Sequence, residues 1–176
     1  MNRKLKLWEL NRVSNEEFKQ QDKFPIIVVL DNIRSLNNVG TFFRTCDSFN
    51  VQEIILCGIT GKPPHREINK TAIGATESMA WSYAEDVMDV VDSLKQDGVK
   101  ICAIEQTETT TFLNEMKVDK TETYALFFGN EVDGVQQTVI DASDYILEIP
   151  QFGTKHSLNV SVCAGVTLWE FVRGRN

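Results

Sequence analysis

The segment Ile149–Val162 reads IPQFGTKHSLNVSV and decides how the rest of the chain is interpreted. An apolar strand, Asp144–Ile149, runs into a loop that contains Pro and Gly, and a helix that is apolar on almost every side follows over about Ser157–Val172. Unpaired polar groups are costly to bury. Ser157 and Asn159, at the start of such a helix, therefore indicate a ligand site, although both could also serve as helix caps.

Outside this segment, short apolar strands alternate with helices. We expect strands at Ile26–Asp31, Glu53–Cys57, Ser78–Tyr83, Val99–Ile104 and Tyr124–Phe128, and helices at Val39–Phe49, Ile68–Ile73, Asp86–Lys95 and Val135–Ala142. This alternation predicts an α/β fold with a mostly parallel sheet flanked by helices. Residues 1–24 are interpreted as a short basic N-terminal arm and residues 25–176 as the domain.

Three polar segments come directly after predicted strands: Asn32–Asn38, Gly129–Gly134 and Gln151–Asn159. Ligands of open parallel sheets bind beyond the carboxyl ends of the strands, so we expect these segments to converge. Taken alone, Asn38 and Arg44 are a capping Asn and a surface Arg. Likewise, GNEVDG at 129–134 is either a plain turn or a place where glycine lets a ligand approach the backbone.

The composition excludes several other classes. The chain has no GxGxxG or GxxxxGK[ST] phosphate motif. Its four cysteines form no CxxC pair and it has only two histidines, so we expect no metal site, reduced thiols and a cytoplasmic location. The longest strongly apolar run, Ile26–Leu30, is far too short to cross a membrane. Ser157 lacks the G-x-S-x-G context of a hydrolase nucleophile.

Charge is divided unevenly along the chain. The net charge of −7 argues against a nucleic-acid partner, but residues 1–84 carry 11 Lys/Arg and 9 Asp/Glu, whereas residues 85–176 carry 7 and 16. The N-terminal half could therefore meet a polyanion. Its candidate cations are Arg3, Lys4, Lys6, Arg34, Arg44, Lys62, Arg66 and Lys70. Taken alone, the charge pattern favours a solvated surface over a polyanion site.

Together the three polar segments resemble the motifs of the SpoU (TrmH-like) branch of the SPOUT methyltransferases, over roughly Ile26 to Val172. An Asn followed six residues later by Arg-Thr is matched by Asn38, Arg44 and Thr45. The G-x-E-x-x-G turn is matched at 129–134, and I-P-x-x-G-x-x-x-S-L-N-V-S at 149–161, without a gap. Each motif is weak alone, but their order and spacing are specific.

The resemblance implies a SPOUT fold with a C-terminal deep trefoil knot, S-adenosyl-L-methionine as cofactor, and methyl transfer to a ribose 2′-hydroxyl of structured RNA. It assigns catalysis to Asn38, Arg44, Glu131, Ser157 and Asn159, and cofactor binding to Phe128, Gly129, Ile149, Gln151, Leu158 and Asn159. Because only a short basic arm precedes residue 25, tRNA is favoured over rRNA as the partner. A non-catalytic RNA-binding knot domain is the alternative.

The last predicted helix also bears on assembly. A helix that is apolar nearly all round has to be buried nearly all round. A second copy of the chain is a natural cover at a chain end, and the resembling family is typically dimeric. We therefore expect a homodimer through the C-terminal helix.

Overall fold

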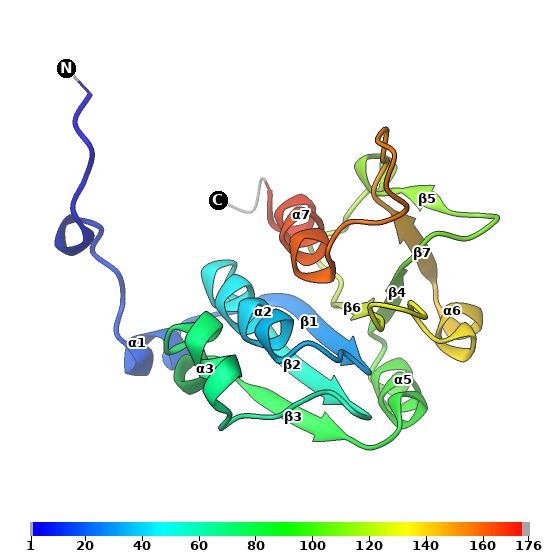
Figure 1. The fold of residues 1–176 in the computed structure, drawn as a ribbon, viewed down its shortest axis with the longest axis horizontal. Helices are drawn as coiled ribbons and strands as arrows, with labels where there is room; N and C mark the ends of the chain where they lie inside the picture. Colours follow the sequence, from blue (N-terminus) through cyan, green and yellow to red (C-terminus); the bar gives the residue numbers. More distant parts are fainter. Residues whose placement is uncertain (1, 174–176) are drawn as a thin grey trace.

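In a computed structural model, which describes residues 2–173, seven strands form one sheet and every strand pair is parallel (Figure 1). The spatial order is β3-β2-β1-β6-β4-β7-β5. The strands are β1 (Phe24–Asp31), β2 (Val51–Cys57), β3 (Trp81–Ala84), β4 (Lys100–Ile104), β5 (Thr111–Phe112), β6 (Tyr124–Phe128) and β7 (Tyr145–Glu148). The predicted α/β class with a parallel sheet is confirmed, and the knot stays a prediction.

Helices cover both faces of the sheet. They are α1 (Asn15–Gln20), α2 (Leu36–Ser48), α3 (Arg66–Ala72), α4 (Ala75–Ser78), α5 (Val87–Gln96), α6 (Gln137–Ala142) and α7 (Val160–Val172), with short 3₁₀ turns η1 (Leu7–Glu9) and η2 (Leu113–Glu115). Val28 and Leu30 of β1 pack with α1–α4 and α7, and Ile27 and Val29 pack with α5 and α6. This two-sided burial explains why β1 is a continuous apolar run.

The register of the central strands fixes where the polar segments meet. Leu30 of β1 pairs with Phe128 of β6, so the two strands end at the same level of the sheet. The loop that follows β1 and the turn that follows β6 therefore emerge side by side. These are the segments Asn32–Asn38 and Gly129–Gly134, which are expected to form the site.

Several predicted boundaries differ from those in the structure. Helix α2 begins at Leu36, not Val39, because the Ser35 side chain caps it by accepting the N–H of Asn38. Helix α7 begins at Val160, not Ser157. The strand expected over 78–83 is β3 at 81–84, since Ser78 ends α4. The two-residue edge strand β5 was not predicted; it pairs with β7.

Helices α2 and α3 cross at very close range at Gly40. A Cβ on Gly40 would lie 2.1 Å from Thr71 Oγ1 and 2.2 Å from the Ile68 carbonyl oxygen. The Thr71 hydroxyl also donates to the Asn37 carbonyl over 3.0 Å. This crossing holds the N-terminal half of α2, and with it Asn38, against α3.

Replacing Gly40 with Ala is expected to lower the free energy of unfolding by about 1–3 kcal/mol, because the α3 backbone has to move to admit the methyl group. Urea denaturation measures the change. Ser48→Ala, on the exposed side of the same helix, is the control and should stay within about 0.5 kcal/mol of the parent. A Gly40→Ala protein as stable as the parent would contradict the close crossing.

Candidate functional site

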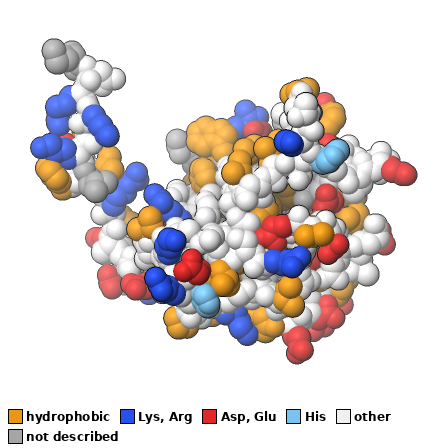
Figure 2. Space-filling model, viewed as in Figure 1, with side chains coloured by type: hydrophobic (Ala, Val, Ile, Leu, Met, Phe, Trp, Pro, Cys, Tyr) orange, Lys and Arg blue, Asp and Glu red, His pale blue; other side chains and the backbone are white. Residues whose placement is uncertain are grey.

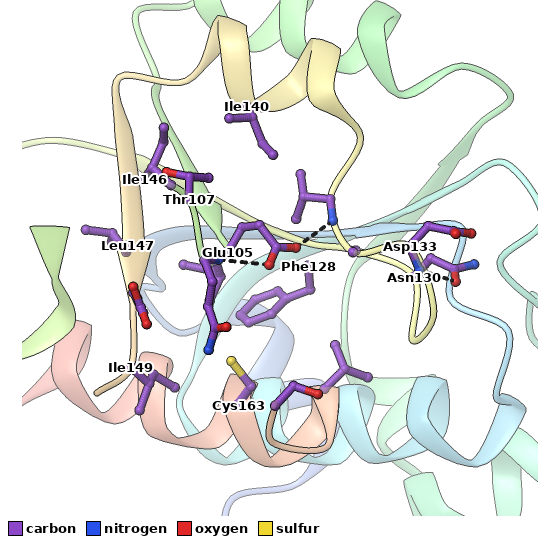
Figure 3. Close-up of a pocket in the computed structure, with 18 of the residues that line it drawn as sticks. Glu105, Thr107, Phe128, Asn130, Asp133, Ile140, Ile146, Leu147, Ile149 and Cys163 are labelled. Atoms are coloured by element: carbon purple, nitrogen blue, oxygen red, sulfur yellow. Dashed lines mark hydrogen bonds between the residues drawn. The ribbon is translucent and has the colours of Figure 1, made fainter. Parts of the chain in front are cut away.

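A cavity of about 1180 Å³ opens at the carboxyl ends of β4, β6 and β7 and reaches the start of α7 (Figure 3). Its wall is partly apolar, and Figure 3 shows Phe128 near the centre with Cys163 reaching in from α7. A concave site of this size with a few polar groups is suited to a small-molecule ligand. The structure thus places this cavity where parallel sheets bind ligands.

All the residues that the resemblance assigns to the cofactor line this one cavity. They are Phe128, Gly129, Ile149, Gln151, Leu158 and Asn159. Two of the predicted catalytic residues, Glu131 and Ser157, line it as well. The convergence of the segments after β6 and β7 is therefore confirmed, while the role of each residue stays a prediction.

Glu131 joins the turn after β6 to the start of α2. Its carboxylate accepts the backbone N–H of Arg34 over 2.9 Å and that of Ser35 over 3.0 Å. The side-chain amide of Asn38 donates to the same carboxylate over 2.9 Å. Three hydrogen bonds to one charged acceptor fix the loop between β1 and α2 against the turn.

Asn159 completes the link to α7 and has two tasks. Its Oδ1 accepts the N–H groups of Ser161 and Val162 and so caps α7. Its Nδ2 donates to Oδ1 of Asn38 over 3.2 Å. The capping interpretation of Asn159 is therefore confirmed and its ligand role stays a prediction, whereas Asn38 does not cap α2 but lies inside its first turn. We call Asn38, Glu131 and Asn159 the polar cluster.

The charge on Glu131 is stabilised by its position. Partial desolvation by itself raises the pKa of this carboxyl, but the hydrogen bonds from Arg34, Asn38 and Ser35 together outweigh it and hold the pKa below the ordinary value. Glu131 is therefore a carboxylate, and only an acceptor, at neutral pH. At neutral pH it cannot donate a proton. It therefore acts by fixing the groups that donate to it, which are two backbone N–H groups and the Asn38 amide.

The folded turn itself requires glycine at position 129. A Cβ on Gly129 would lie 2.1 Å from backbone atoms of both Gly134 and Val135. The turn folds back on itself there, and Asn130 and Gly134 exchange two backbone hydrogen bonds of 3.0 and 2.9 Å. Close approach of the chain itself therefore requires glycine at this position, and the approach of a ligand there stays a prediction.

Arg44 lies apart from the polar cluster. It is in α2, is exposed, and does not line the cavity. Within residues 2–173, its guanidinium has no hydrogen-bond or ion-pair partner. The structure does not bring Arg44 together with Glu131, whose carboxylate accepts from the side-chain amide of Asn38 instead.

The sequence analysis missed the loop after β4. Glu105, Gln106, Thr107 and Thr109 all line the cavity. Glu105 accepts the N–H of Val135 over 2.9 Å and that of Gln106 over 2.8 Å, as the dashed lines in Figure 3 show. The sequence does contain a signal for these residues, because this polar loop, like the three predicted segments, directly follows the carboxyl end of a buried strand.

Cys163 is the thiol in the cavity wall. Burial raises its pKa to about 11, so it stays protonated at neutral pH and is a poor nucleophile. No cluster of three or more metal-ligating side chains occurs in the part of the chain that is described. None of the described helices is long and apolar enough to cross a membrane.

A sequence model of the SpoU rRNA Methylase family matches residues 25–169. The chain therefore belongs to that family. A curated relative, 23S rRNA (guanosine-2′-O-)-methyltransferase RlmB of Vibrio cholerae, is 29% identical over 167 residues, which cover 95% of this chain and 66% of that protein. This chain thus spans just under two thirds of the length of that relative.

Solved structures resemble the fold closely. The Aquifex structure titled "A. aeolicus TrmH/SpoU tRNA modifying enzyme" superposes with a TM-score of 0.80 at 27% identity, over 92% of this chain and 80% of the other. The AdoMet-bound rRNA methyltransferase of Sinorhizobium meliloti gives 0.79 at 26% identity, over 92% and 61%. These values confirm a SPOUT-type methyltransferase domain as the fold.

Removing the charge of Glu131 is expected to change how stability depends on pH. A carboxyl whose folded-state pKa is lowered stabilises the fold above its ordinary pKa of 4.5, and that contribution is lost as the pH falls through the lowered value. Glu131→Gln should therefore be less stable than the parent at pH 7, and the difference should shrink below about pH 4.5. Urea unfolding between pH 7 and 3 measures it; a difference that does not vary with pH would contradict the assignment.

Proposed function

We propose that the chain transfers a methyl group from S-adenosyl-L-methionine to a ribose 2′-hydroxyl of structured RNA. The observation that carries the proposal is the polar cluster, which joins three distant segments at the rim of a cavity lined by every residue assigned to the cofactor. Membership of the SpoU family supports it. So do the relatives described above, which are RNA methyltransferases and a tRNA modifying enzyme.

The cavity residues fit this cofactor. Ile149 and Leu158 offer apolar surface for a purine ring, and backbone groups beside Gly129 can hydrogen-bond its edge. Glu105 and Glu131 offer carboxylates that favour a positively charged sulfonium and ammonium over a neutral ligand. When bound, S-adenosyl-L-methionine supplies an electrophilic methyl group.

The chain's own residues then have to position and stabilise the ribose oxygen. Asn38 uses one amide hydrogen on Glu131 and one lone pair on Asn159, which leaves it one donor and one acceptor for RNA. Arg44 is free to bind an oxygen that becomes negatively charged. A guanidinium with a pKa above about 12 is a poor base, so charge-assisted hydrogen bonding to the developing alkoxide is the role that chemistry supports.

We propose tRNA as the substrate in preference to rRNA. Its support is the close match of the fold to the A. aeolicus TrmH/SpoU tRNA modifying enzyme, with a TM-score of 0.80 at 27% identity. A cytoplasmic location also belongs to the proposal, supported by the free thiols Cys46, Cys57, Cys102 and Cys163.

Arg44→Ala should lower the rate of methyl transfer to tRNA at least about 100-fold, because a charged donor to the reacting oxygen is removed. Calorimetry should show the affinity for S-adenosyl-L-methionine within about twofold of the parent, since Arg44 does not line the cavity. Lys95→Ala, an exposed cation on α5, is the control for the loss of one charge. An Arg44→Ala enzyme that methylates tRNA at nearly the parental rate would refute the assignment.

We also propose that two copies pair through α7. Ala164, Leu168 and Phe171 are buried against the sheet, whereas Val162, Val166 and Trp169 form an apolar stripe at helical spacing on the opposite side. Trp169 is 60% exposed. A second copy that presents the same stripe would cover it by twofold symmetry.

Trp169→Glu combined with Val166→Glu should convert a dimer into a monomer, because two carboxylates would be buried in the interface. Sedimentation velocity at micromolar concentration measures the change. Ile59→Glu places the same charge on an exposed apolar residue outside α7 and should leave the dimer intact. A parent protein that sediments as a monomer would overturn the pairing.

A further inference from the structure

Charge is separated in space as well as along the chain. Residues 1–84 hold 11 of the 18 Lys/Arg, and residues 85–176 hold 16 of the 25 Asp/Glu. Figure 2 shows cations along the projecting arm and the adjoining part of the body, where acidic groups also lie, whereas acidic groups predominate on the side away from the arm. An overall acidic protein thus presents a local basic surface, and it is the local potential that attracts a polyanion.

The arm is cationic even after its acid is counted. Residues 3–12 contain Arg3, Lys4, Lys6 and Arg12 but only one carboxylate, Glu9. Arg3 binds both oxygens of Glu9, over 2.8 and 3.0 Å. Within the described chain, no hydrogen bond or ion pair engages the charged groups of Lys4 and Arg12, and the Lys6 ammonium lies 5.0 Å above the Trp8 ring.

Trp8 adds a second kind of contact to these cations. Its side chain is 74% exposed on an arm that stands away from the body (Figure 1). An exposed indole among lysines and arginines is the combination that binds single-stranded nucleic acid, since bases stack on the ring while the cations meet the phosphates. Within the described residues, neither the exposed indole nor the cations around it pack against the body of the chain.

The arm is connected to the polar cluster through the surface of the body. Helix α1 packs on α4, α4 on α3, and α3 crosses α2 at Gly40. Exposed Arg66 and Lys70 lie on α3, and exposed Arg34 directly precedes α2. The backbone N–H of Arg34 donates to Glu131, so this end of the series adjoins the proposed catalytic site. We call Lys4, Lys6, Arg12, Arg34, Arg66 and Lys70 the basic track.

We propose that the basic track binds the RNA backbone that leads away from the methylated ribose, with Trp8 stacking on a base at its far end. The proposal rests on the proposed function and names the surface that supplies most of the RNA affinity of an otherwise acidic protein. The arm is its essential part. Removal of its cations should weaken RNA binding and leave the cofactor cavity unchanged.

The test compares two triple variants that lose the same charge. Lys4→Gln/Lys6→Gln/Arg12→Gln removes three track cations and spares the Arg3–Glu9 pair. Lys95→Gln/Lys117→Gln/Lys120→Gln removes three lysines from the acidic half. Fluorescence anisotropy with bulk tRNA at several KCl concentrations gives the affinity and its salt dependence.

For the arm variant we expect affinity at 0.15 M KCl at least about tenfold below the parent, and a slope of log K against log salt that is smaller by about 2–3, because each phosphate contact contributes about 0.7–0.9. The control variant should keep the parental slope. Trp8→Ala should weaken binding about fivefold or more and leave the slope unchanged, since stacking releases no counterions.

The outcomes separate this proposal from the proposed function. If the parent binds tRNA but transfers no methyl group, the function fails, while the slopes still test the track. An arm variant with the parental slope and affinity would overturn the track. So would an arm variant that binds tRNA normally but sediments as a monomer, because the arm would then serve the second copy of the chain.

Discussion

The site depends on the carboxylate of Glu131. It accepts two backbone N–H groups before α2 and the amide of Asn38, and Asn38 in turn accepts from Asn159 at the start of α7. Glu131 and Asn159, which follow Asn38 by 93 and 121 positions in the sequence, are thereby held with it in one hydrogen-bond network. The position of Asn38 next to the cavity is set by this acceptor, and hydrogen bonds to the charged form keep the pKa of Glu131 low enough for the acceptor to persist.

The sequence was sufficient for the parallel α/β class and for the meeting of segments after β1, β6 and β7, because apolar strands and the polarity at their carboxyl ends are local patterns. It was insufficient for the details that depend on tertiary contacts. Ser35 rather than Asn38 caps α2, since Asn38 is taken up by Glu131 and Asn159. Gly129 accommodates Gly134 and Val135, residues whose approach only the folded turn reveals.

Composition was the least informative property. A net charge of −7 argues against RNA, yet residues 1–84 carry a small excess of bases and residues 85–176 carry most of the acids. Association is governed by the potential where the partner docks and by short-range phosphate contacts, which salt screens over about 10 Å. An acidic side that repels RNA and a basic side that binds it would orient the substrate toward the polar cluster.

The central claim is that the polar cluster and the cavity beside it carry out methyl transfer to a ribose oxygen. The most direct measurement incubates the purified chain with tRNA and S-adenosyl-L-methionine that carries a labelled methyl group, followed by digestion to nucleosides and mass spectrometry. We predict label in a 2′-O-methylnucleoside, located on the ribose fragment. Label on a nucleobase would contradict the account, as would cofactor binding by calorimetry with no label in RNA.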